Sequence, residues 1–150
     1  MTHRSKEGKL NFFSKIIKNH TLQDYLKDPF LPFKFRKAIT NFRIGNHRLP
    51  VEVGRYYGRV ERAERLCPLC SNDIGDEWHY LLYCNNTIIK SNRDQVFHEI
   101  DHFEPGFSQK NESDKIDFLM NCTRHECSLK IGFLINKFDS IFKEIQPQFL

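Results

Sequence analysis

The spacing of four metal-ligand side chains constrains this chain more than any other feature. From Cys67 the sequence reads CPLCSNDIGDEWHYLLYC, which is C-x2-C-x8-H-x4-C with Cys67, Cys70, His79 and Cys84 as candidate ligands. A two-residue gap lets the backbone turn so that both sulfurs of a Cys pair reach one ion. Three thiolates and one imidazole form a soft, closed ligand set that favours a structural Zn²⁺ with no open position for water. The pattern therefore predicts a zinc knuckle over residues 67–84.

The second half of this motif sets a geometric condition on the backbone. Residues 76–83 are predicted to form a short helix, and His79 and Cys84 lie five residues apart. On an ideal α-helix that spacing separates two side chains by about 140° around the axis. The helix must therefore end or distort near residues 83–84 for both ligands to face one ion. Gly75 is expected to supply the conformational freedom for a chain reversal before this helix.

Cysteine usage and hydropathy indicate the compartment. The chain has five cysteines, an odd number that does not suggest a disulfide framework. No apolar stretch approaches the ~20 residues that cross a bilayer, and residues 1–18 are too polar and basic for a signal peptide. We expect an intracellular protein, nuclear or cytoplasmic and without membrane contact, where clustered Cys bind metal. Ordinary buried thiols are the alternative for any Cys. Packing or exposed thiols are favoured over a second metal site for Cys122 and Cys127, which flank His125.

Charge is distributed unevenly along the chain. Residues 1–66 hold 15 Lys and Arg against 6 Asp and Glu, a net charge of +9, whereas residues 67–150 hold 8 against 13, a net charge of −5. A one-sided basic block suggests a polyanionic partner, and a solvated surface is the other interpretation. Guanidinium groups suit bidentate phosphate binding. The candidate phosphate contacts are Arg43, Arg48, Arg55, Arg59, Arg62 and Arg65.

Hydrophobic periodicity predicts a mainly α fold, with several short-to-medium helices around the central zinc knuckle. Helices are expected over residues 10–26 (as one helix or two), 32–43, 87–103, 113–120 and 127–145, with residues 45–66 mostly irregular apart from a turn of helix at 62–66. Thr87 and Ser113 are the candidate N-caps, and Gly45 is a candidate helix stop. The expected organisation is a frayed 1–9 followed by a single helical domain over 10–150. That domain comprises a basic segment (34–65), the zinc knuckle (67–84) and C-terminal helices (87–150).

Four further side chains have two interpretations each. Tyr56 and Tyr57 are able to stack on unpaired bases, although packing against the knuckle is favoured. Trp78 shares a helical face with apolar neighbours, so a core position is favoured over stacking. His47 is a candidate alternative ligand, but a hydrogen-bonding or phosphate-contacting role is favoured in a basic segment.

The run FRIGNHRLPVEVGRYYGRVERAERLCPLCSNDIGDEWHYLLYC, residues 42–84, resembles a known zinc-binding region. It is similar to the C-terminal end of reverse transcriptases from non-LTR (LINE-type) retrotransposons. The features that carry the resemblance are Phe42-Arg43, Asn46-His47-Arg48-Leu49, Gly54-Arg55, Arg62, Arg65, the Cys/His set and Glu77-x-His79-x-Leu81-Leu82-x-Cys84. The resemblance is dense over 42–84 and extends in less detail over roughly 25–145.

The resemblance implies a zinc knuckle packed on helices that helps to grip template RNA or target DNA. The four ligands carry over directly, and the basic positions carry over as candidates. The chain has no Tyr-x-Asp-Asp-like carboxylate pair and no recognisable endonuclease carboxylate set, so we expect no enzyme activity. We expect a fragment of such an element, or a degenerate or co-opted copy, whose partners are RNA or DNA phosphates and the rest of a reverse transcriptase polyprotein. The alternative is a zinc-stabilised protein–protein interaction module that docks through its acidic C-terminal helices.

Overall fold

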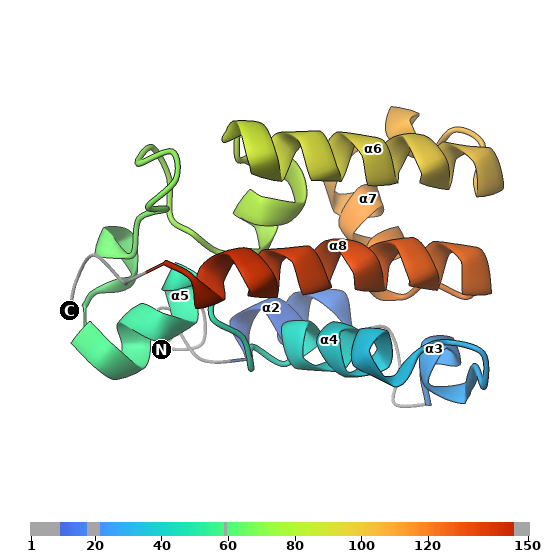
Figure 1. The fold of residues 1–150 in the computed structure, drawn as a ribbon, viewed down its shortest axis with the longest axis horizontal. Helices are drawn as coiled ribbons and strands as arrows, with labels where there is room; N and C mark the ends of the chain where they lie inside the picture. Colours follow the sequence, from blue (N-terminus) through green and yellow to red (C-terminus); the bar gives the residue numbers. More distant parts are fainter. Residues whose placement is uncertain (1–9, 18–21, 59, 146–150) are drawn as a thin grey trace.

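Helix α8 (His125–Lys143) lies along the middle of the molecule, with α6 (Thr87–Phe103) on one side and α4 (Phe33–Arg43) on the other (Figure 1). This computed structural model describes residues 10–17, 22–58 and 60–145, and the side chains of 57 and 58 are outside the description. The broad apolar face of α8 is buried against both neighbours. Gly132 allows the closest approach, because a Cβ there would stand 2.5 Å from the Cβ of Phe35 on α4.

Shorter helical elements complete the described fold. They are α2 (Asn11–Ile16), α3 (Asp24–Lys27), α5 (Pro50–Val53), the π-helix η1 (Gly54–Gly58), the 3₁₀ turn η2 (Arg62–Glu64), the π-helix η3 (His79–Tyr83), the 3₁₀ turn η4 (Phe107–Gln109) and α7 (Glu112–Met120). The only β pairing in the described chain is an isolated antiparallel bridge between Leu66 and Ile74. The predicted mainly α fold is confirmed. No helix among the described residues is long and apolar enough to cross a bilayer, and residues 1–9, predicted to be frayed, lie outside the description.

The helix boundaries follow the sequence pattern closely, but the caps differ. The chain leaves α4 through Gly45, whose φ of 77° is favourable for glycine. Helix α6 begins at Thr87, yet its cap is Asn86, whose side chain accepts hydrogen bonds from the backbone amides of Ile88 and Ile89. Helix α7 is capped by Asn111 in the place expected for Ser113. Both predicted caps were wrong because a capping side chain sits one residue before the first helical residue, and Asn serves there as well as Ser.

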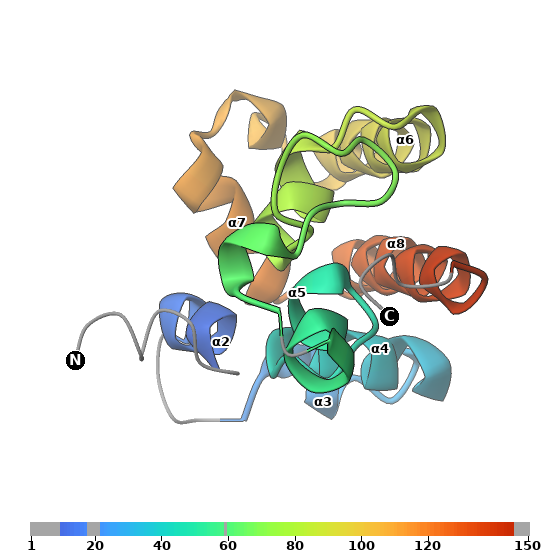
Figure 2. The same cartoon turned by 90° about the vertical axis from the view of Figure 1, so that its left-hand side faces the viewer.

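The prediction that residues 45–66 are mostly irregular was wrong. This segment winds through α5, η1 and η2, which together with the loop that follows gather at one end of α4 and α8 (Figure 2). Leu49 and Val51 are each 1% exposed. Burial of these apolar side chains stabilises helical turns that are too short to form alone.

Aromatic packing joins the Cys/His segment to the helices. The Trp78 ring meets the Phe12 ring edge-on at 4.9 Å between centroids, and Phe12 in turn meets Phe42 at 5.6 Å. Tyr80 is fully buried and contacts Phe142 of α8 at 5.0 Å. The core interpretation of Trp78 therefore agrees with its packing. These contacts hold the segment before Cys84 against the central helices.

Candidate metal centre

The fold brings all four predicted ligands together. One ligand atom from each of Cys67, Cys70, His79 and Cys84 can be chosen so that all four lie within 4.8 Å of one another. The first two come from a tight turn in which the Ser71 amide donates to the Cys67 carbonyl at 2.8 Å. The other two flank the π-helix η3. No other such group of three or more His, Cys, Asp or Glu occurs among the described residues.

The spacing within the cluster fits a tetrahedral ion. The two sulfurs of Cys67 and Cys84 are 3.9 Å apart, and the Cys70 sulfur is 3.4 Å from Nε2 of His79. Zinc bound at ordinary Zn–S and Zn–N lengths has tetrahedral S···S edges of about 3.8 Å and S···N edges of about 3.6 Å. These two edges match a four-coordinate metal, and the four ligand atoms all lie within 4.8 Å of one another. All four positions of that geometry are filled by protein atoms.

The π-helix resolves the geometric problem posed by the His-x4-Cys spacing. The Cys84 amide donates to the His79 carbonyl at 2.8 Å, which is an i to i+5 hydrogen bond. A π-turn is wider than an α-turn, so a residue five positions along returns closer to the same face. The predicted distortion near 83–84 is confirmed. Such π-turns occur mostly at functional sites because they otherwise cost stability.

Backbone hydrogen bonds frame the first ligand pair as a small hairpin. The Cys67 amide donates to the Asp73 carbonyl at 2.8 Å, and the Gly75 amide donates to the Arg65 carbonyl at 2.9 Å. The Val51 amide then donates to the Gly75 carbonyl at 3.1 Å, which ties the hairpin to α5. The ligand loop is thus fixed at both ends by main-chain contacts.

Gly75 has a different role from the one expected. Its φ is not among the positive values of the described chain, so conformational freedom is not what the position requires. A Cβ here would stand 2.7 Å from Cγ of Pro50 and 2.8 Å from the Tyr80 hydroxyl. Only a residue without a side chain lets the hairpin approach α5 this closely.

Gly75→Ala is therefore expected to lower the free energy of unfolding by about 1–3 kcal/mol, the usual cost of overpacking. Denaturant unfolding of the two proteins measures this difference. Gly106→Ala is the contrasting variant, since a Cβ at Gly106 meets nothing within 4 Å, and its cost comes only from a φ of 88°. A Gly75→Ala protein as stable as the wild type would show that the side chains of Pro50 and Tyr80 move away from the new Cβ at little cost in free energy.

Arg93 supports the second ligand pair and was missed by sequence reasoning. From α6 its guanidinium donates to the carbonyl of Cys84 at 2.8 Å and to that of Tyr80 at 3.3 Å. Burial lowers the pKa of Arg93, as expected for a cation inside the fold. The sequence did contain one indication of this role. Arg93 lies between Ile89 and Val96, on the face of α6 that is otherwise apolar. A cation at such a position indicates buried acceptors.

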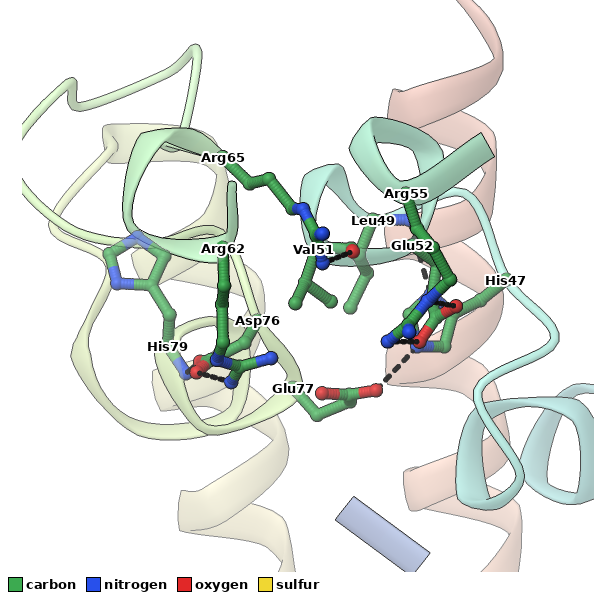
Figure 3. A network of polar contacts seen from close by, with 10 residues as sticks. All are labelled: His47, Leu49, Val51, Glu52, Arg55, Arg62, Arg65, Asp76, Glu77 and His79. Carbon is green, nitrogen blue, oxygen red and sulfur yellow. Dashed lines mark hydrogen bonds and ion pairs between the residues drawn. The ribbon is translucent and has the colours of Figure 1, made fainter. Parts of the chain in front are cut away.

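The backbone of His79 is held by a neighbouring carboxylate. Its amide donates to a carboxylate oxygen of Asp76 at 2.8 Å, and Arg62 holds the other oxygen of Asp76 at 3.0 Å (Figure 3). Burial raises the pKa of Asp76. The other ring nitrogen, Nδ1, is buried without a hydrogen-bond partner, and a carboxylate oxygen of Asp73 lies 4.0 Å away, too far for a direct hydrogen bond. A metal-bound His commonly gives its second N–H to such an acceptor.

The cysteine sulfurs are electrostatically coupled. The hydrogen bond from Cys84 lowers the pKa of Cys67 to about 3, and the same bond raises the pKa of Cys84. Burial raises the pKa of Tyr80, and its interaction with Cys67 raises it further. The two sulfurs are therefore close enough to influence each other's ionisation.

Two of the predicted phosphate contacts are buried. Arg43 is 4% exposed and donates to the carbonyl of Met120, and burial lowers its pKa. Arg65 is 8% exposed and donates to the carbonyls of Val60 at 2.8 Å and Val51 at 3.0 Å. These two guanidinium groups satisfy backbone acceptors inside the fold, so neither is available to a phosphate in this structure. Sequence position alone did not distinguish them from surface arginines.

Two others are half-buried and paired with acids. Arg55 lies 3.3 Å from Glu52, and Arg62 lies 3.0 Å from Asp76 (Figure 3). Burial raises the pKa of Glu52, and the charge of Arg55 opposes that shift. These arginines compensate carboxylates within the segment. Their charge is consequently weaker toward a partner than the sequence suggested.

Of the two remaining arginine candidates, the structure describes Arg48 but not Arg59. Arg48 is exposed, and it is the only one of the described candidates that is. Arg59 lies outside the described residues, as does the side chain of Tyr57. Tyr56 is 57% exposed. The five described arginines therefore do not form one open face.

His47 lies outside the ligand cluster and takes part in a buried polar pair. Its Nε2 is 2.7 Å from a carboxylate oxygen of Glu77, and both side chains are less than 5% exposed (Figure 3). Its Nδ1 accepts a hydrogen bond from the Leu49 amide at 3.2 Å. Because Nδ1 is an acceptor, Nε2 carries the proton and donates it to Glu77. The pair joins the chain before α5 to the residue two positions before the ligand His79.

Cys122 and Cys127 are both buried. A hydrogen bond from Cys127 lowers the pKa of Cys122, so the two thiols lie side by side. Neither belongs to a group of three or more candidate ligands in the described chain. The interpretation of these residues as packing thiols is consistent with this position.

Comparisons with known proteins found no match, so the interpretation of this site depends on its geometry. No family model matches the chain. No curated protein and no solved structure matches it either.

Proposed function

We propose that this protein is a zinc-dependent nucleic-acid-binding module, similar to the C-terminal zinc-binding region of non-LTR retrotransposon reverse transcriptases. The observation that carries the zinc proposal is the cluster of Cys67, Cys70, His79 and Cys84, whose ligand atoms lie within 4.8 Å of one another. Zinc is the metal that this soft ligand set favours. The resemblance of residues 42–84 supports the choice of partner.

The zinc is structural in this proposal. Its four positions are filled by protein ligands, so no site remains where water would be activated. The metal would hold the hairpin of Cys67 and Cys70 against η3, where His79 and Cys84 flank a π-turn. We therefore assign no catalytic residue and no enzyme activity to the chain.

The nucleic-acid partner is supported by charge. The net charge of residues 1–66 is +9, and an RNA or DNA backbone is the polyanion that such a basic block would meet. Binding would be mainly to phosphates, in an intracellular compartment, and the rest of a reverse transcriptase polyprotein would be a further partner. Of the arginines first considered, Arg48 and Arg59 remain the best candidates. Arg43 and Arg65 no longer belong to the proposal.

The second candidate is a zinc-stabilised protein–protein interaction module from a co-opted or degenerate element. The observation that favours it is the acidic first turn of α7, where Glu112 and Asp114 are exposed. Acidic surfaces repel nucleic acid and attract basic protein partners. Direct nucleic-acid binding distinguishes the two candidates.

Arg48→Ala with Arg59→Ala is expected to flatten the salt dependence of nucleic-acid binding. Each phosphate contact contributes roughly 0.7–0.9 to the slope of log K against log salt, so the double variant should lose up to about two units. A salt titration of RNA and DNA oligonucleotide binding measures the slope. Zinc content should stay unchanged, because neither residue is a ligand.

Lys90→Ala with Lys143→Ala is the matched control, since it removes the same charge from exposed positions in the acidic half of the chain. Its slope should equal that of the wild type. If both double variants show the same slope of log K against log salt, Arg48 and Arg59 do not contact the nucleic acid. A wild type that binds neither RNA nor DNA would favour the protein-interaction module.

A further inference from the structure

Two phenylalanines stand almost fully exposed at the corner between α3 and α4. Phe30 is 81% exposed and Phe33 is 73% exposed, the highest values among the large hydrophobic side chains described. Single exposed apolar residues are common on protein surfaces. Two bulky aromatic rings three residues apart are less readily explained, because each forgoes the free energy of burial. They are a candidate contact surface.

The corner is braced, so this exposure is built into the fold. The Phe30 amide donates to a carboxylate oxygen of Asp28 at 2.9 Å, and Leu31, the next residue, is buried. Arg36 donates from α4 to the carbonyls of Asp28 at 2.6 Å and Leu31 at 3.1 Å. The other carboxylate oxygen of Asp28 pairs with His125 of α8 at 2.5 Å. Phe30 therefore extends from a backbone that several elements hold in place.

Cationic residues flank these two phenylalanines in the sequence, and the ammonium of Lys34 lies over the neighbouring Phe35 ring at 5.2 Å from its centroid. Helix α4 (Phe33–Arg43) contains Lys and Arg but no Asp or Glu. Lys34 and Lys37 are exposed on its first turns. On α3, Lys27 is exposed and paired at 3.6 Å with Asp24. The corner thus presents aromatic faces and ammonium groups side by side along the chain.

This combination selects one class of occupant. Aromatic side chains stack on the faces of unpaired bases, while a basic surface follows the phosphates, which is how single strands are bound without sequence preference. In a duplex the base faces are covered by neighbouring pairs. A purely apolar partner would gain nothing from lysines that lack acidic neighbours on α4.

We propose that residues 27–37, the α3–α4 corner, bind single-stranded nucleic acid, with bases stacked on Phe30 and Phe33 and phosphates on Lys34 and Lys37. This proposal rests on the nucleic-acid-binding function above and specifies the strand state of the ligand. It also places a contact surface on lysines of α4 that the arginine motif did not include.

The test compares three double variants with the wild type on a 20-nucleotide oligo(dT), its RNA equivalent and a duplex of the same length. Phe30→Leu with Phe33→Leu keeps apolar side chains but removes the aromatic faces. Its affinity for both single strands should fall about tenfold or more, since each stacked base contributes substantially. Phe30→Trp with Phe33→Trp should retain or increase the affinity, and its added fluorescence should be quenched by oligo(dT). Lys34→Ala with Lys37→Ala should flatten the salt slope by about two units.

Ile88→Ala is the control, because Ile88 is 61% exposed on α6 and should have no effect on binding. All substituted side chains are on the surface, so melting temperatures should stay near that of the wild type. Single-strand binding unchanged by the Leu substitutions would overturn the corner proposal and leave the general function intact. Phosphatidylserine vesicles are tested as an alternative anionic ligand. If the protein binds these vesicles but no single strand, and the Leu substitutions leave vesicle binding unchanged, the corner proposal is also overturned. A wild type that binds no nucleic acid would overturn both proposals.

Discussion

Cys84→Ser is expected to abolish stoichiometric zinc binding and to unfold residues 67–84. The wild type should contain about one zinc per chain. Structural zinc contributes about 10–16 kcal/mol of binding free energy, and this becomes folding free energy because the site does not exist in the unfolded chain. A domain of this size is stable by only about 5–15 kcal/mol. Loss of one ligand therefore removes a large part of what holds the knuckle.

Metal analysis and amide hydrogen exchange over 67–84 measure the two effects, and a chelator added to the wild type should reproduce them. Cys122→Ser is the matched control, since Cys122 is also a buried thiol but contacts no candidate ligand cluster. It should keep its zinc and lose only about 1–3 kcal/mol, the usual cost of burying an imperfectly paired hydroxyl. Equal losses in both variants would mean that Cys84 is not a ligand.

His47→Leu is expected to lower the free energy of unfolding by about 3–5 kcal/mol, the usual cost of removing one partner from a buried polar pair that includes a charge. The substitution leaves the carboxylate of Glu77 without its imidazole donor at a position only 4% exposed. Because Glu77 lies close to the ligand His79 in the chain, zinc affinity should also fall. Denaturant unfolding with saturating zinc isolates the first effect.

The double variant His47→Leu with Glu77→Leu should recover part of this loss, since an apolar pair leaves no unpaired group. Asp94→Asn supplies the surface comparison, because it breaks the exposed Lys90–Asp94 pair at 2.7 Å and should cost less than about 1 kcal/mol. Strictly additive losses in the double-mutant cycle would show that the two side chains do not stabilise each other.

Relations between residues close together in the sequence were sufficient to predict much of the fold. The apolar spacing predicted α4, α6 and α8 to within about two residues at most ends, because a helix that buries one face must repeat apolar residues at helical intervals. The four residues of the Cys/His cluster could be named as candidate ligands because zinc chemistry accepts few side chains and few spacings. Even the distortion after His79 followed from the angle between residues five positions apart.

Burial was the property that the linear pattern could not supply. Arg43 and Arg48 look alike in the sequence, yet one donates to a carbonyl inside the fold and the other is exposed. Arg43 lies on the face of α4 that meets its neighbours, whereas Arg48 lies in the connection between α4 and α5. Which face of α4 is buried is decided by contacts distant in sequence. The role of Gly75 was misjudged for the same reason, since Pro50 approaches it from another element.

The sequence by itself determined a mainly α chain with a Cys/His motif suited to zinc and a basic first half. Those properties depend on residues near one another, through helical periodicity, ligand spacing and formal charge. Only the tertiary structure decided which cations reach solvent, that His47 pairs with Glu77, that Arg93 supports the ligand segment, and that Phe30 is held outward. Each of these depends on packing between elements far apart in the chain, where excluded volume and the need to satisfy buried polar groups select the partners.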